Sequence, residues 1–330
     1  MRRLLCFLLV AMVAVVLPTV VVAHDGSTAE SGDIIRALGV WQVDAPGLAL
    51  VLLVGGLYGW AYVRLRRDSP TFHFPRWHAW CFWAGWVFML LGLTSPIDTY
   101  SDDLFWVHML QHVLITMIVA PLMLLGAPAT LALRAASPRV REMYLVPLLN
   151  SRLVWFLTYP PVAIFIFVAG IWSWHLPAAY DAAIASEALH FVEHGVFLIG
   201  AMLFWWMVIG VDATKLRPHH VWRCAVLVIA ILQNIGLGLI LTNIGEAIYE
   251  TYSTAAAARE WGPSALTDQR IGAGIMWVPG SMMFAIAIVV TVYFWAERES
   301  FKGRQSDTVR DMQLRVHGEI DTLGPRSGEQ

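Results

Sequence analysis

Residues 104–126 read LFWVHMLQHVLITMIVAPLMLLG, a run without any Asp, Glu, Lys or Arg. An α-helix rises about 1.5 Å per residue, so a run of this length crosses the roughly 30 Å hydrocarbon core of a bilayer. The chain has seven mostly apolar runs of about this length, near residues 46–64, 76–94, 104–126, 153–174, 188–210, 221–242 and 271–295. It is 58% hydrophobic and only 14% charged, unlike an ordinary soluble domain. We therefore predict an all-α, polytopic transmembrane bundle with seven spans over residues 46–295.

The N-terminus has the pattern of a secretory signal. Met1-Arg2-Arg3 precedes an apolar stretch that ends in small residues at Ala23. We expect residues 1–23 to be a signal peptide that is cleaved before His24, followed by a short periplasmic segment at 24–45. The alternative is an uncleaved signal anchor, because residues 4–23 are long enough to span the membrane.

The basic residues predict the orientation of the bundle. Of the 22 Lys and Arg, those beside the ends of the first, third, fifth and seventh runs form the large majority, whereas the opposite side has only Arg36, Arg259 and Arg270. The positive-inside rule then places the N-terminus in the periplasm or outside the cell, and the C-terminus in the cytoplasm. The tail at 296–330 is polar and lacks apolar periodicity, so we expect a flexible cytoplasmic extension.

Five histidines are expected at similar depth below the outer face. His108 and His112 lie near the outer start of the third helix, which Ser101, Asp102 and Asp103 are expected to cap. The fifth helix repeats the spacing with His190 and His194 after Ser186, and His175 closes the fourth helix on the same side. Each i, i+4 pair presents both rings on one helix face.

Ionisable groups at membrane depth are costly unless they pair, face water or bind a ligand. Imidazole is the commonest metal ligand among side chains, so the pattern predicts a metal site. Imidazole with thioether suits copper, and imidazole with carboxylate suits zinc or iron. Cys81 and Cys224 fall toward the cytoplasmic halves of their helices and are not expected to reach it. The predicted metal site comprises His108, His112, His175, His190, His194, Met109, Met276 and Glu193, with Glu193 as the acceptor that fixes a ring tautomer, and these donors leave copper, zinc and iron open. The plainer alternative is that each ring bonds a backbone carbonyl.

Several stretches resemble the CtaG family of multi-span bacterial cytochrome c oxidase assembly factors. They are FWVHMLQH at 105–112, APLMLLGAP at 120–128, WHLPAAYD at 174–181, the His190–His194 segment and DQRIGAGIMWVPG at 268–280. The resemblance implies an inner-membrane chaperone, not an enzyme, that supplies copper to haem-copper oxidase of the respiratory chain. Its partners would be an oxidase subunit, contacted through membrane helices, and a periplasmic copper donor, with no nucleic acid. Arg270 departs from the tighter Gly-Gly pair we expect there, and it suggests an ion pair with Asp268.

In this interpretation copper meets Asp98, Asp102 and Asp103 before it reaches the paired imidazoles, and His175 acts as a gate or fifth ligand. Two other classes of protein stay open. An intramembrane zinc hydrolase would use Glu193 or Asp268 as general base. A b-type cytochrome would hold haem between histidines of facing helices. The sequence has no phosphate-binding Gly-Lys loop and no nucleic-acid patch beyond ordinary basic loops.

Overall fold

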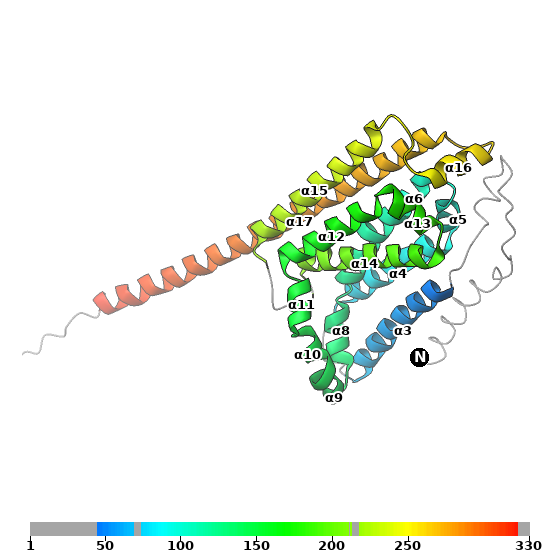
Figure 1. The fold of residues 1–330 in the computed structure, drawn as a ribbon. Coiled ribbons are helices and arrows are strands. Elements are labelled where there is room, and N and C mark those ends of the chain that lie inside the picture. The colour runs from blue at the N-terminus through cyan, green and yellow to red at the C-terminus, as the bar shows by residue number, and fades with distance from the viewer. Residues whose placement is uncertain (1–44, 69–73, 211, 213–217, 323–330) are drawn as a thin grey trace, which may run out of the picture.

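The computed structural model describes residues 45–68, 74–210, 212 and 218–322, and these residues form helices and connecting turns without any strand (Figure 1). The predicted signal peptide, the segment at 24–44 and the last eight residues lie outside the described part. The all-α prediction is therefore confirmed for the residues that the structure describes.

Within the part of the chain that the structure describes, five helical stretches are long and apolar enough to cross a membrane. They lie in α3 (Ala45–Asp68), in the unit from Phe105 to Ala135, in α14 (Glu187–Ile209), in α15 (His220–Asn243) and in α17 (Ala265–Thr322). A sixth span results if α12 (Pro160–Trp174) and α13 (Pro177–Ile184), which meet at a 77° bend, count as one. The chain is thus a multi-pass membrane protein. The expected second span corresponds to α4 (Arg76–Thr94), which packs against α3 and the third span, and seven spans remain a prediction.

The third span consists of consecutive helical segments of different type. It runs through α6 (Phe105–Val113), the π-helix η2 (Leu114–Val119) and α7 (Ala120–Leu125), and α8 (Pro128–Ala135) follows a turn at Ala127. The Thr116 hydroxyl donates to the carbonyl of His112 at 2.6 Å, and the Trp205 indole N–H donates to the carbonyl of Thr116 at 2.8 Å. A π-turn widens the helix and leaves some backbone carbonyls to be satisfied by side chains. Trp205 satisfies the carbonyl of Thr116 in this way.

Helices α15 and α17 pack side by side along most of their membrane length (Figure 1). Close approach depends on Gly238, since a Cβ there would lie 2.5 Å from the Trp277 ring. The Asn234 amide donates to the carbonyl of Met276 at 3.1 Å, within one turn of the internal Pro279. Beyond the core, α17 continues as a helix to Thr322. The tail from residue 296, expected to be a flexible extension, is therefore helical up to that residue. This extension is mostly polar, although Phe301, Val309 and Met312 are exposed on it, and it includes the ion pair between Glu299 and Lys302.

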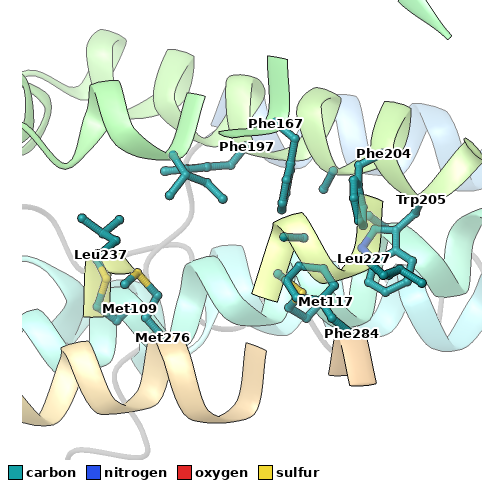
Figure 2. Close-up of a cluster of buried hydrophobic side chains, with 14 of the residues drawn as sticks. Met109, Met117, Phe167, Phe197, Phe204, Trp205, Leu227, Leu237, Met276 and Phe284 are labelled. Atoms are coloured by element: carbon teal, nitrogen blue, oxygen red, sulfur yellow. The ribbon is translucent and has the colours of Figure 1, made fainter. Parts of the chain in front are cut away.

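The short helices gather at the two ends of the bundle (Figure 1). One end holds α5 (Pro96–Ser101), α13 and α16 (Glu250–Ala258). The opposite end holds α9 (Pro138–Val140), η3 (Arg141–Leu145), α10 (Val146–Leu149) and α11 (Arg152–Leu157). Between them lies a buried aromatic core in which Phe167, Phe204 and Phe284 contact one another (Figure 2). This core packs α12, α14 and α17 against one another and so fixes their relative positions.

Candidate metal centre

The two histidine pairs meet between α6 and α14. Within α6 the ring centroids of His108 and His112 lie 4.3 Å apart, and within α14 those of His190 and His194 lie 4.4 Å apart. Across the two helices, His108 lies 5.2 Å from His190 and His112 lies 5.4 Å from His194. Residues about eighty positions apart in the sequence therefore form one compact imidazole cluster.

Glu193 lies inside this cluster and is only 1% exposed. Its Oε1 lies 3.5 Å from Nε2 of His112, and its Oε2 lies 3.9 Å from Nε2 of His108. Ligand atoms of His108, His190 and Glu193 all lie within 4.8 Å of one another, a separation that one metal ion can bridge. The carboxylate thus faces ring nitrogens directly, which makes Glu193 a candidate ligand and not only a group that orients a ring.

Several polar atoms of the cluster are buried without a hydrogen-bond partner among the described residues. They are Nε2 of His108, both ring nitrogens of His112, Nε2 of His194 and Oε2 of Glu193. An unsatisfied buried polar group costs about 1–3 kcal/mol, so native structures rarely gather several in one place. Nitrogen lone pairs and a carboxylate that converge in this way fit a bound cation chemically.

A hydrogen-bonded tyrosine network fixes the tautomer of His108. The Tyr252 hydroxyl donates to the carbonyl of Ser101 at 2.7 Å, and its oxygen lies 3.2 Å from Nδ1 of His108. Since that hydroxyl hydrogen is already used, Nδ1 of His108 donates to Tyr252 and Nε2 keeps its lone pair toward Glu193. Tyr180 adds its hydroxyl 3.2 Å from that of Tyr252. Sequence reasoning missed these tyrosines, because the connection that carries Tyr252 matches no metal-binding pattern.

The N-terminal end of α6 is held by α17. The Asp268 carboxylate accepts the backbone N–H groups of Phe105 and Trp106 at 3.0 Å each, and it lies 3.6 Å from the Arg259 guanidinium. The expected cap by Ser101, Asp102 and Asp103 is wrong, because the residue before the helix is Leu104 and no side chain of that segment caps it. The expected Asp268–Arg270 pair is also wrong, since Arg270 instead donates to the carbonyl of Thr242.

The start of α14 agrees with expectation, since the Ser186 hydroxyl caps it by accepting the N–H of Leu189. Near the cluster, Asp98 accepts the Gln111 amide at 2.7 Å. Burial, with the neighbouring Asp103 and Glu187 charges, raises the pKa of Asp102 to about 6, although its side chain keeps enough exposure for solvent to screen the effect. The three aspartates expected on an entry path thus differ in environment, and the Asp98 carboxylate is already hydrogen-bonded to Gln111.

The two methionines and His175 lie beside the cluster and not within it. Met109, Met276, His112 and His175 line a pocket of about 30 Å³ between α6, α12, α15 and α17. Figure 2 shows Met109 and Met276 next to each other at one end of the buried core. The sequence-predicted residues therefore separate into a histidine–glutamate cluster (His108, His112, His190, His194 and Glu193) and a methionine–histidine pocket, with His112 common to both.

Fold and site together define a multi-pass helical membrane protein with a buried imidazole–carboxylate cluster. The family model described as cytochrome c oxidase caa3 assembly factor (Caa3_CtaG) matches residues 56–298, well over half of the chain. The chain belongs to this family, which confirms the resemblance found in the sequence and supports a role in oxidase assembly.

Two mycobacterial proteins are similar to most of the chain. An uncharacterized protein of Mycobacterium leprae is 28% identical over 81% of this chain, and one of Mycobacterium bovis is 29% identical over 84%. The chain spans about two fifths of the length of these relatives, 41% and 42% respectively. No solved structure matches the chain.

Proposed function

We propose that this protein binds copper in the histidine–glutamate cluster and supplies it to a haem-copper oxidase during assembly. Membership of the assembly-factor family supports the oxidase as the destination. The convergence of His108, His112, His190 and His194 on the buried carboxylate of Glu193, with unpartnered donor atoms among them, is the observation that carries the proposal. Copper is the cargo of this process, so the protein must both hold and release it.

The donor set favours copper over other cargo. Imidazole and carboxylate alone would also suit zinc, but thioether sulfur lies directly beside the cluster and is a soft ligand that selects copper. Nitrogen and oxygen donors without a thiolate allow exchange, because a partner with its own imidazoles can compete for the ion. Tyr252 keeps the Nε2 lone pair of His108 available, which assists binding without adding a bond to the ion.

The proposed setting is the bacterial inner membrane, with seven spans if α4 also crosses it. The end that carries α5, α13 and α16 would face the periplasm, because the basic connections collect at the other end. Copper would arrive there from a periplasmic donor. An oxidase subunit would receive it through contact within the membrane, where helices of the two proteins meet.

The test is metal analysis of the full chain purified in detergent. Wild-type protein loaded with copper should retain a stoichiometric amount, and the His112→Ala, His194→Ala double variant should lose it. Cells that carry the double variant should lose oxidase activity. His220→Ala is the matched control, because His220 stacks on Trp295 in a different part of the molecule. Survival of both copper content and oxidase activity in the double variant would refute the site.

The same preparation separates the two other functions. A b-type cytochrome would show a Soret band with stoichiometric haem. A zinc hydrolase would turn over lipid esters when loaded with zinc and would lose that turnover on Glu193→Gln. Copper retention without either signal supports the assembly role.

A further inference from the structure

The pocket beside the cluster has an unusual lining. Three methionines, Met109, Met117 and Met276, surround it together with His112 and His175, and the remaining lining is mostly apolar. Methionine commonly fills gaps in a core, but here the side chains border a space instead of filling it. A volume of about 30 Å³ has room for a single small occupant such as one water or one ion.

His175 supplies a nitrogen donor that is ready to bind. Its Nδ1 lies 2.8 Å from the carbonyl of Ile171, so this nitrogen carries the hydrogen and Nε2 carries the lone pair. The side chain is only 7% exposed, and Nε2 has no hydrogen-bond partner among the described residues. The Tyr249 hydroxyl donates to the backbone carbonyl of His175 at 3.1 Å, which holds the residue at the end of α12. The bond to Ile171 thus orients the ring, and the bond from Tyr249 holds the backbone of the same residue.

The sulfur-bearing residues are also held in place. The Asn234 amide bonds the backbone carbonyl of Met276 and contacts Gly280, where a Cβ would lie 2.7 Å from its nitrogen. Met109 packs against Gly272 of α17, since a Cβ there would lie 3.1 Å from Cγ of Met109. Side chains from two helices thus face one space with little freedom to move away, which favours a preorganised site over an accidental gap.

We propose that this pocket is a second binding site, specific for a monovalent soft cation, with Met109, Met276 and His175 as donors. Thioether and imidazole are the ligands preferred by Cu(I), and a largely apolar pocket disfavours divalent ions that keep a hydration shell. His112 borders both this pocket and the histidine–glutamate cluster, so a cation can pass between the two sites by exchange at one shared ligand. This inference rests on copper as the cargo of the proposed function.

The test uses the full chain in detergent, loaded without oxygen with Cu(I) or with Ag(I) as a redox-stable probe. X-ray absorption should detect sulfur neighbours of the bound metal in wild-type protein. Met276→Leu should lower the number of sulfur neighbours and weaken Ag(I) binding at least about tenfold in competition with a chelator. Leucine nearly preserves the volume of methionine, so folding is retained. Met207→Leu is the matched control, because Met207 is a buried core methionine outside the pocket.

A second variant separates this inference from the proposed function. His108→Ala with His194→Ala removes two donors of the histidine–glutamate cluster and leaves every residue of the pocket unchanged. Sulfur-bound Ag(I) should persist in this variant. Absence of sulfur neighbours in wild-type protein, or an unchanged affinity in Met276→Leu, overturns the second site. If copper is then still bound through nitrogen and oxygen, the proposed function stands without it.

Discussion

Asp268→Asn should destabilise the protein although Asp268 lies outside the metal centre. Its fully buried carboxylate accepts two backbone N–H groups at the start of α6 and lies 3.6 Å from Arg259. Hydrogen bonds to a charged group are worth about 1.5–3 kcal/mol each, and removing one partner of a buried ion pair costs about 3–5 kcal/mol. Asparagine keeps one acceptor oxygen, so we expect a loss of about 3 kcal/mol in the free energy of unfolding.

The assay is denaturant unfolding in mixed micelles of Asp268→Asn, Arg259→Met and the double variant. The two changes should be non-additive by about 1–3 kcal/mol, because the second change removes the charge that the first leaves unpaired. Asp103→Asn is the comparison variant, since Arg259 bonds the backbone carbonyl of Asp103 and acts on its carboxylate only through a longer-range electrostatic attraction. That variant should change stability little.

Metal binding provides the second readout of Asp268→Asn. The two N–H groups that Asp268 accepts belong to Phe105 and Trp106, less than one turn before His108, so their release should loosen the first turn of α6 and lower copper affinity. Additive effects of the two single changes would refute the ion pair. Unchanged stability together with unchanged copper affinity would refute the reasoning that α17 positions the His108 ring.

Three shorter predictions test other contacts. Glu193→Gln should weaken copper binding about 10–100-fold in chelator competition, and an unchanged affinity would remove Glu193 from the site. Gly238→Ala should cost about 1–3 kcal/mol because its Cβ would meet Trp277 at 2.5 Å, whereas Gly236→Ala, with open space, should preserve stability or increase it in the same unfolding assay. The raised pKa of Asp102, about 6, means that the folded state binds its proton more tightly than the unfolded state does. Stability should therefore fall as pH rises from about 4 to 6, and Asp102→Asn should flatten that part of a melting-temperature profile.

Local sequence pattern was enough to predict the helical bundle and both histidine pairs. Apolar runs define segments of membrane length, and the i, i+4 spacing puts two rings on one face whatever the neighbouring helix is. The distribution of arginines predicts that the third and fifth helices both start on the face opposite the basic connections, and therefore that His108 and His190 lie at a similar depth. For this reason we expect the two local pairs to form one cluster. The structure brings these rings together as that argument required, and their metal remains a prediction.

The supporting contacts could not be predicted in the same way. Asp268 caps a helix 163 positions away, and Tyr252 reaches His108 across 144 positions. Such partners depend on which helices become neighbours, which single-helix periodicity does not contain. Nearby acidic residues gave the wrong cap for α6, because the approach of α17 supplies Asp268 instead. Nearby Arg270 gave the wrong partner for Asp268, because Arg259 at the end of α16 takes that place.

Other histidines in the same chain show how a structural imidazole differs from those of the cluster. Nδ1 of His78 lies 2.5 Å from the carbonyl of Leu125, and Nδ1 of His219 accepts the N–H of Val221 at the start of α15. Both use a ring nitrogen to satisfy backbone. His112, in contrast, has two buried ring nitrogens that bond nothing among the described residues, with the Glu193 carboxylate 3.5 Å away. A histidine that bonds backbone has that ring nitrogen satisfied, whereas the arrangement around His112 places a lone pair and a negative charge where only a proton or a metal cation balances them.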